Sequence, residues 1–442
     1  MVKKTTALAA CAVLVIAACG GDDDSGSDST DAPAEASAEE PAEEPAEEPA
    51  EEPAEEPAEE PAEEPAEEPA DGSGLDVDAI LAADPACADP VTGDAITVGY
   101  AADFSDLGGF ADGPGSAAVE HFINQINCSG GVDGRPVELI VRDISGDPEA
   151  TVLAANELLE AEPIGLLGPP FPDFGFPLLQ VTAGETPVIF TASTEPALSD
   201  TAAQSFLVSF DDTLQATAAA QFALDQGWST AVTFSAPGPY FGYNPEIFTE
   251  VFEAGGGTVI SDYNFVPVDD VDFSTQVDEM AGGDAPDVIY SAMLSFQLTA
   301  LRGQIDEAGI ETNYISTDAF EATGGYFGDN IEGIYHTTHA FPDANGGRYT
   351  ALENSFAAAT GAGSESPTFA AVAVDGLLVL LDAYLRTGSD DAAVIGAAIP
   401  DAAGVEAITG TLTYGGNANP AKTVYVHQVV DGAPSLAAEI DS

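Results

Sequence analysis

Short apolar runs alternate along most of the chain with segments whose apolar positions recur every three or four residues. Runs such as AITVGY (95–100) and TPVIFTAS (186–193) predict buried strands, and the segments between them predict helices. Strands that alternate with helices in this way are typical of βαβ units in parallel sheets. Residues 75–442 are long enough for two domains. The pattern therefore predicts an α/β fold with two doubly wound parallel-sheet lobes.

Individual elements follow from the same pattern. Asp147 and Pro148 predict the start of one helix, because an acid can cap it and proline suits its first position. The other predicted helices cover 114–127, 244–254, 274–281 and 296–308, and the predicted strands cover 95–100, 135–143, 164–170, 186–193, 228–236, 257–265, 286–293 and 313–318. Open sheets bind ligands beyond the carboxyl ends of their strands. Candidate site residues are therefore those that directly follow a strand.

The first 19 residues predict export. Two lysines precede an uncharged apolar run of 14 residues, 5–18, and small residues precede Cys19, which is the order of a secretory signal. A membrane-spanning helix needs about 20 apolar residues. The segment 16–19 resembles the bacterial lipobox, whose cysteine is lipidated and becomes the first mature residue. The alternative is an ordinary cleaved signal with an incidental cysteine at this position.

Residues 20–74 predict a disordered acidic linker. Residues 39–70 are eight copies of Glu-Glu-Pro-Ala, and a segment with dense like charge and no aromatic or β-branched residues cannot form a core. At about 3.1 Å per residue in an extended proline-rich conformation, these repeats could span roughly 100 Å. They either hold the following domain away from a surface or result from repeat expansion without a length requirement.

The charge excludes one class of partner. Of the 77 acids, 54 lie in residues 75–442 against six basic residues, a formal charge of 54 − 6 = 48 negative charges. Such a surface repels phosphate backbones and anionic lipid heads. We expect no nucleic acid partner.

The stretch INCSGGVDGRPVELIVRD (126–143) connects a predicted helix to a strand through three glycines. Cys128 lies here, and Cys87 is the only other cysteine beyond residue 19. In an exported protein two such cysteines commonly form a disulfide. The alternative is two free buried thiols.

Enzyme motifs are not found in the sequence. It has no Gly-x-Ser-x-Gly, no Cys-x-x-Cys, no phosphate-binding P-loop, and no Gly-x-Gly-x-x-Gly after the first strand. His336 and His339 lie in a segment that predicts a strand, so their side chains should point to opposite faces. We expect no catalytic residue, no cofactor and no metal site.

Several side chains at strand ends suit a small amphiphilic or cationic solute. Asp173 and Asp318 could meet an ammonium group, Ser193 and Thr194 offer hydroxyls, and the aromatic candidates are Phe104, Phe110, Phe171, Phe174, Phe176, Tyr240 and Phe241. Ordinary structural roles are the alternatives. Asp318 or the Ser193–Thr194 pair could cap a helix, Asp173 could be a solvated loop acid, and the 171–176 aromatics could pack within a lobe.

An ordered set of motifs carries a family resemblance. It comprises Phe104-Ser105, the stretch 126–137, Arg142-Asp143, Gly146-Asp147-Pro148, Leu167-Gly168-Pro169, Pro187-Val188-Ile189, 193–198, Tyr240-Phe241-Gly242, Asp375-Gly376 and 424–432. Together they resemble the type I solute-binding proteins of the leucine/isoleucine/valine class, which serve ABC transporters. The resemblance covers nearly all of residues 94–434.

The resemblance implies a clamshell of two lobes that close on a ligand and are joined by three hinge crossings. The crossings are expected near 210–213, 339–342 and 419–422. Lobe 1 would then comprise about 75–211 and 340–420, and lobe 2 about 212–339 and 421–442.

The resemblance also assigns ligand-binding positions. Ser193 and Thr194 match a place that holds the ligand carboxylate, Asp318 the acidic position that holds its ammonium group, and Tyr240 or Phe241 an aromatic lining position. Phe110 matches an aromatic residue that covers the ligand. A serine of the family is replaced by Pro169-Pro170-Phe171-Pro172-Asp173, which argues against an anion at that place because proline lacks an N–H. Leu294 stands where family members often have an aromatic residue.

Combined with the export signal, the resemblance implies a lipid-anchored protein outside the cytoplasm. We expect a monomer that captures a small amino-acid-like, amine or amide solute and delivers it to an ABC transporter permease. It would meet the membrane only through the lipid at Cys19. The alternative is a surface sensor or adhesion module with the same clamshell.

Overall fold

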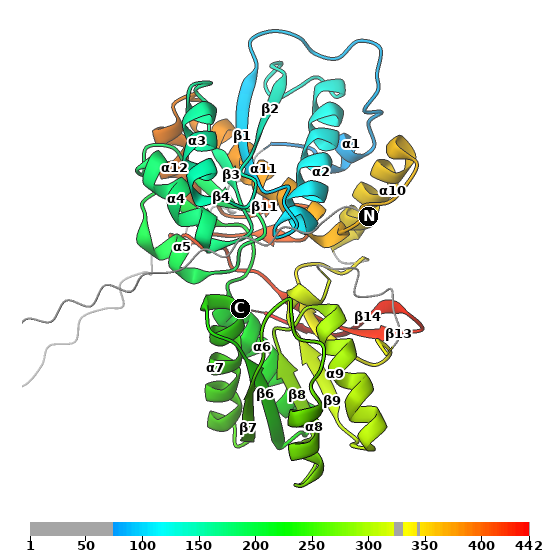
Figure 1. Ribbon diagram of the computed structural model, residues 1–442. Coiled ribbons are helices and arrows are strands. Elements are labelled where there is room, and N and C mark those ends of the chain that lie inside the picture. The colour runs from blue at the N-terminus through cyan, green and yellow to red at the C-terminus, as the bar shows by residue number, and fades with distance from the viewer. Residues whose placement is uncertain (1–73, 322–329, 343–344, 442) are drawn as a thin grey trace, which may run out of the picture. The chain divides into compact units, whose positions relative to one another are not determined.

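The computed structural model describes residues 74–321, 330–342 and 345–441 (Figure 1). The expected export signal, Cys19 and the acidic linker lie outside these residues. The described part of the chain contains two large sheets, each with helices on both faces.

The first sheet is wholly parallel and has the strand order β2-β1-β3-β4-β5. Its strands are β1 (Ile96–Ala102), β2 (Val137–Asp143), β3 (Leu166–Gly168), β4 (Val188–Phe190) and β5 (Ser205–Leu207). The accompanying helices are α1 (Val77–Leu81), α2 (Gly109–Cys128), α3 (Pro148–Leu159), α4 (Pro172–Thr182), α5 (Pro196–Thr201), α10 (Arg348–Thr360), α11 (Pro367–Thr387) and α12 (Ala392–Ala398). Short 3-10 turns, η2 (Asn345–Gly347) and η3 (Ile399–Asp401), and a small hairpin of β11 (Val405–Glu406) and β12 (Thr411–Leu412) complete this part.

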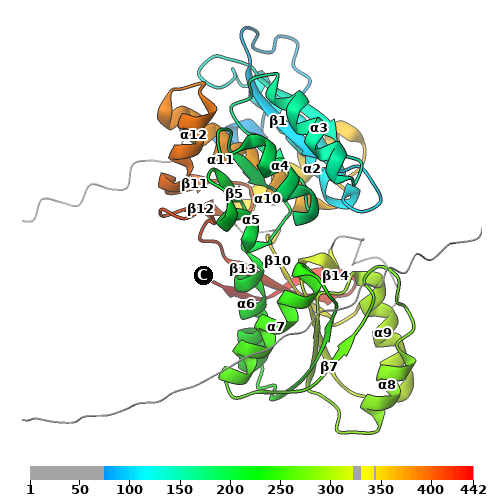
Figure 2. The same ribbon diagram turned by 60° about the vertical axis from the view of Figure 1, so that its left-hand side comes forward.

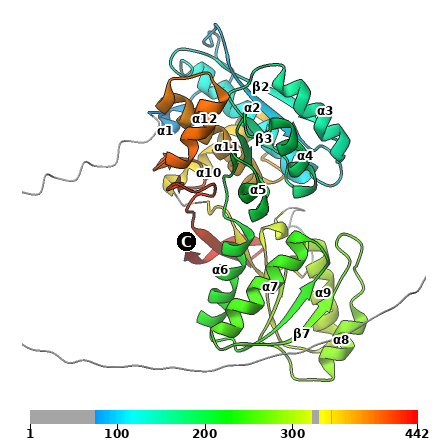
Figure 3. The ribbon, with the colours of Figure 1, turned by 90° about the vertical axis from the view of Figure 1, so that its left-hand side faces the viewer.

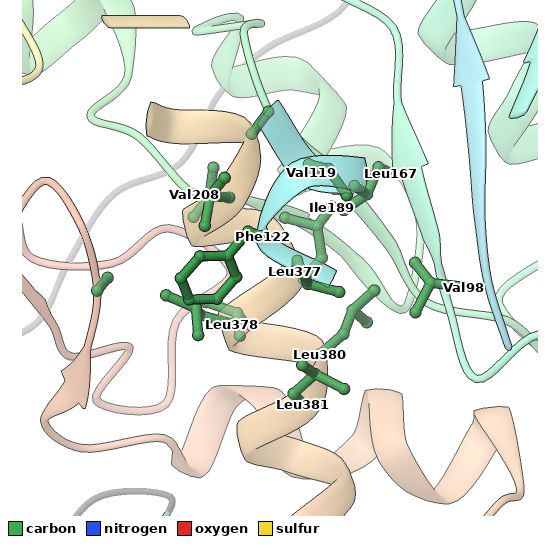
Figure 4. Close-up of a cluster of buried hydrophobic side chains, with 14 of the residues drawn as sticks. Val98, Val119, Phe122, Leu167, Ile189, Val208, Leu377, Leu378, Leu380 and Leu381 are labelled. Carbon is green, nitrogen blue, oxygen red and sulfur yellow. The ribbon is translucent and has the colours of Figure 1, made fainter. Parts of the chain in front are cut away.

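Helices α2 and α11 form the main core with one face of this sheet (Figure 4). Phe122 of α2 lies among Leu377, Leu378 and Leu381 of α11, and all four side chains are buried. Helices α3 and α4 pack on the opposite face (Figure 3). Among the described residues only α11 is long and apolar enough to cross a membrane, and 94% of its apolar window is buried. It is therefore the central core helix.

The joint between α2 and β2 contains the predicted disulfide, Cys87–Cys128, with a Cα–Cα distance of 5.8 Å. Gly131 in this joint has a positive φ of 76°, and a Cβ there would collide with the carbonyl group of Arg135. Only glycine suits this conformation. The joint ties the segment before β1 to the end of α2.

The second sheet has the strand order β14-β13-β10-β9-β8-β6-β7. Its parallel strands are β6 (Thr230–Ser235), β7 (Thr258–Asn264), β8 (Val288–Ser291), β9 (Asn313–Ser316) and β10 (Tyr335–Thr338). Two antiparallel strands, β13 (Val424–Val430) and β14 (Ala433–Ile440), extend it beyond β10. The helices are α6 (Asp212–Asp225) and α7 (Pro239–Ala254) in one core, α8 (Ser274–Ala281) and α9 (Ser295–Ala308) in the other, and the 3-10 turn η1 (Asp318–Phe320) (Figure 2).

The predicted α/β class and the doubly wound parallel sheets are confirmed, and the antiparallel β13–β14 pair is an addition. Helices α2 and α7 begin five residues earlier than expected. The expected starts lay at Pro114 and next to Pro245, but both prolines lie inside the helices. The chain leaves the first sheet after β5, returns after β10 and leaves again before β13, so three links join the two sheets. The expected lobe boundaries remain a prediction.

Candidate functional site

Two strand ends and the start of α6 meet in a buried polar network. Thr194 follows β4, and its Oγ1 donates a 2.7 Å hydrogen bond to Oδ1 of Asp212, the first residue of α6. The backbone N–H of Asp212 donates back to the carbonyl oxygen of Thr194 at 2.9 Å. Both side chains are at least 97% buried. Oδ2 of Asp212 has no hydrogen-bond partner within the described part of the chain, so it is open to a hydrogen bond with a ligand.

Asp318 is held at the end of β9 by groups from two other elements. The hydroxyl of Tyr240, near the start of α7, donates to Oδ1 at 2.6 Å, and Nε2 of His339 lies 3.0 Å from Oδ2. The Tyr240 hydroxyl also accepts a hydrogen bond from the backbone N–H of Ala319 at 3.2 Å. The ring of His339 stacks on Phe210, with centroids 4.0 Å apart. The predicted aromatic and acidic positions therefore touch each other.

Gln215 of α6 links the two acids. Its Nε2 donates to Oδ1 of Asp212 at 3.3 Å, and its Oε1 accepts from the backbone N–H of Asp318 at 3.0 Å. Its Oε1 also accepts a 2.8 Å bond from Thr337. A continuous chain of hydrogen bonds thus runs from Thr194 to Asp318.

The environment gives the two carboxyl groups different charge states. Burial raises the pKa of Asp212 to about 8, with Asp318 and Glu195 adding to the rise, although the hydrogen bond from Thr194 opposes it. Burial also acts on Asp318, but the hydrogen bonds from His339, Tyr240 and the side chain of Gln215 to this residue outweigh it, so its pKa is lowered. Burial lowers the pKa of His339, and we take His339 as neutral with Nε2–H as donor. Near neutral pH Asp318 is ionised and Asp212 mainly protonated.

Five of the six basic residues of the described chain are occupied elsewhere, and the sixth, Lys422, pairs with Asp375 but lies close enough to His339 for its charge to lower the pKa of that histidine. Each forms an ion pair with an acid outside this network, and the pairs are Arg135–Asp390, Arg142–Glu157, Arg302–Asp306, Arg348–Asp78 and Glu406, Arg386–Asp382 and Lys422–Asp375. The network thus contains two carboxyl groups without a Lys or Arg partner. It suits a ligand that brings a cation or hydrogen-bond donors.

An apolar cluster lies beside the network. Phe110 contacts Phe171 and Phe369 edge-on, with ring centroids 6.2 and 5.5 Å apart, and Ala192 and Leu294 belong to the same cluster. Phe369 also lies edge-on to the ring of His339, 6.3 Å away. Leu294, in the position where the family often has an aromatic residue, therefore lies in the same apolar cluster as Phe110.

Other predicted residues lie apart from the network. Phe104 is 46% exposed, and Asp173 is exposed in the first turn of α4. Phe241 packs on Phe265 in the core beside α8 and α9, so of the two aromatic candidates Tyr240 reaches Asp318. Ser193 is buried next to Thr194. A hollow of about 380 Å³ beside α5, lined by 417–421 and two α5 residues, contains none of the predicted ligand-binding residues.

The sequence did not predict Asp212, Gln215 and His339 as site residues. Asp211 and Asp212 stand directly before a helical segment, a pattern that indicates a capping acid. Asp211 does cap α6, accepting from the N–H of Leu214. The only signal for Asp212 was its place in an expected crossing.

A family model described as periplasmic binding protein matches residues 95–434. No curated protein sequence matches the chain. Among solved structures, a leucine-binding protein from Thermotoga maritima is 21% identical, with 78% of this chain and 98% of that one covered and a TM-score of 0.67.

Two further structures show the same fold. A branched-chain amino acid transporter substrate-binding protein from Streptococcus pneumoniae, in complex with isoleucine, is 18% identical, with 79% and 99% of the two chains covered and a TM-score of 0.68. An ABC transporter solute-binding protein from R. palustris, in complex with benzoate, is 19% identical, with 79% and 98% covered and a TM-score of 0.66. The resemblance to this class of solute-binding proteins, inferred from the sequence motifs, is confirmed.

Proposed function

The chain belongs to the periplasmic binding protein family, and from this premise we propose that it captures a small solute and delivers it to an ABC transporter permease. The family consists of binding proteins rather than enzymes, and it acts outside the cytoplasm. The solute we propose is amino-acid-like, or a related amine or amide. It would be held between the two lobes, which close on it.

The buried pair Asp212 and Asp318 is the observation that carries this choice of solute. The ionised carboxylate of Asp318 favours a bound ammonium or amide N–H, and the open Oδ2 of Asp212 can accept from an ammonium group once the bound cation displaces its proton. Phe110, Phe369 and Leu294 would cover the apolar part of the same molecule. Neither Asp212 nor Asp318 pairs with a Lys or Arg side chain of the described chain, which disfavours an anionic solute at these two carboxyl groups.

A lipid anchor at Cys19 is part of the proposal. The lipobox-like segment 16–19 and the acidic linker 20–74 support it. The Cys87–Cys128 disulfide suits an oxidising compartment outside the cytoplasm. The linker would let the binding domain reach a permease or solutes at a distance from the membrane.

A thermal-shift screen of the full chain tests the proposal, followed by calorimetry on every hit. The solutes would be branched, aromatic and basic amino acids, polyamines, short amides, urea, and aromatic acids without an amine. We expect hits among the amines, amides or amino acids, and weaker binding in Asp318→Asn by up to about 3 kcal/mol, the cost of a lost charged hydrogen bond.

The exposed acid Asp173 supplies the matched control, because Asp173→Asn makes the same chemical change away from the network. Unchanged affinity in this variant and reduced affinity in Asp318→Asn would support the site. Hits restricted to aromatic acids without an amine would contradict the proposed solute class. A screen without any hit would instead favour the sensor or adhesion function.

A further inference from the structure

A second polar cluster lies in the seven-stranded sheet, apart from the Thr194–Asp318 network. His336 of β10 lies directly opposite His427 of β13 in the antiparallel pair. Side chains of directly opposed residues lie on the same face of a sheet. The two rings meet edge-on with centroids 5.3 Å apart, and both side chains are at least 98% buried.

Glu321 brings a carboxylate to the two imidazoles. It follows η1, and its Oε1 lies 3.8 Å from Nδ1 of His427. The hydroxyl of Thr338 donates a 2.9 Å hydrogen bond to the other oxygen, Oε2, which fixes the orientation of the carboxylate. One ligand atom from each of Glu321, His336 and His427 lies within 4.8 Å of the other two.

These three side chains are a recognised donor set for zinc. Ligand atoms about 2.0–2.1 Å from a tetrahedral Zn²⁺ lie about 3.3 Å from one another, so small side-chain rotations would bring the three atoms to that spacing. Nδ1 of His336 lies 3.2 Å from the carbonyl oxygen of Thr337. A ring nitrogen bound to a backbone carbonyl is typical of metal-binding histidines and presents Nε2 to the ion.

The protonation state of the histidines suits a metal. Burial lowers the pKa of His336 to about 4, and burial together with His336 lowers the pKa of His427 to about 4. Both imidazoles are therefore neutral near pH 7, which is the form that binds metal ions. Glu321 would balance part of the charge of the ion.

We propose that Glu321, His336 and His427 form a Zn²⁺-binding site in the seven-stranded sheet. The ion would tie the segment after β9 to β10 and β13, two strands that lie next to links between the sheets. It would therefore stiffen this sheet beside two of the hinges. Zinc binding here does not depend on which solute the protein carries.

The histidine that lies beside His336 is not its neighbour in sequence. His336 and His339 are three residues apart, but His339 contacts Asp318 and Phe210 instead. His427 is distant in sequence, and only the antiparallel pairing of β13 with β10 brings it to His336.

Competition titration measures the Zn²⁺ affinity and stoichiometry of the site. The full chain, produced without a histidine tag, is stripped with a chelator and titrated with Zn²⁺ against a chromophoric chelator. Millimolar Mg²⁺ keeps the surface carboxylates occupied. We expect one tight Zn²⁺ per chain, and a Co²⁺ adduct with the visible absorption of a tetrahedral site.

Glu321→Gln and His427→Gln should each weaken Zn²⁺ binding by about 100-fold, as loss of a ligand costs at least what loss of its supporting contacts does. His121→Gln is the matched control, because His121 is also buried but is hydrogen-bonded to Ser355 in α10. It should bind zinc as the unaltered chain does. Far-UV circular dichroism checks folding, and Glu321→Gln, which keeps the shape of the side chain, carries the test if His427→Gln does not fold.

Two outcomes would overturn the proposal. One is an unaltered chain that takes up no zinc from the competing chelator. The other is equal zinc affinity in the unaltered chain, Glu321→Gln and His427→Gln, which would place the ion on surface carboxylates.

Discussion

The substitution Asp212→Asn should stabilise the protein in a pH-dependent way. Asp212 has a pKa of about 8 in the folded chain because it is buried, whereas an unfolded chain would give about 3.9. A raised folded-state pKa contributes stability that is fully present below the unfolded pKa and is lost as pH rises toward the folded pKa. Asparagine does not ionise, so it avoids this loss of stability, and its side-chain oxygen can still accept the hydrogen bond from Thr194.

The magnitude follows from the separation of the two pKa values. At 1.36 kcal/mol per pH unit, ionisation of Asp212 lowers the unfolding free energy by about 4 kcal/mol at pH 7 and by about 1.5 kcal/mol at pH 5, relative to its value at a pH well below about 3.9. The gain in unfolding free energy on replacing Asp212 should therefore increase by about 2.5 kcal/mol between pH 5 and pH 7.

Urea unfolding at both pH values measures the gain, with Trp228 as the reporter. Trp228 is the only tryptophan in the chain, and its ring lies edge-on to Phe222 of α6, the helix that Asp212 begins. The exposed Asp173 again supplies the control, and Asp173→Asn should change the unfolding free energy by no more than about 0.5 kcal/mol. An equal gain from Asp212→Asn at pH 5 and pH 7 would refute the assignment of a protonated, buried carboxyl group.

Three further outcomes are expected. Binding of a cationic amine should release protons between pH 6 and pH 8, because the ion favours the ionised form of Asp212; calorimetry in buffers of different ionisation enthalpy measures this release, and Asp212→Asn should abolish it. Tyr240→Phe removes the hydroxyl that donates to Asp318 and should lower the unfolding free energy by about 1.5–3 kcal/mol; urea unfolding without such a loss would contradict that role. Replacement of both Cys87 and Cys128 by serine removes the disulfide, whose cysteines have a sequence separation of 41 residues, and should lower the unfolding free energy by about 4 kcal/mol on the loop-entropy model. An equal urea midpoint for the oxidised chain and this variant would contradict the estimate.

Most of the fold was predictable because it depends on local patterns. The apolar runs gave the parallel strands, and helix α8 spans the predicted residues, 274–281. The starts of α2 and α7 were misplaced because Pro114 and Pro245 lie inside these helices. The antiparallel edge was not predicted, since strand direction depends on how the chain returns and not on local pattern.

The site was only partly predictable. Thr194, Tyr240 and Asp318 came from matching motifs, and the structure places them in one hydrogen-bonded network. Asp212 and His339 depend on contacts across the links between the sheets, with partners 18 and 21 residues away in sequence. Periodicity and spacing cannot predict such contacts. In the local sequence Asp212 looks like an acid at a helix start, and His339 looks like a residue at the end of a strand.

Charge connects the site to the whole surface. The 48 net negative charges counted for residues 75–442 create a field that attracts cations and repels anions at low ionic strength. Asp212 and Asp318 apply the same preference at short range, where screening by salt is weak. If the solute is an amine, its association rate should therefore fall with added salt while the buried contacts to these two acids persist, which stopped-flow measurements at several salt concentrations would separate. An association rate independent of salt would mean that the acidic surface serves solubility rather than capture of the solute.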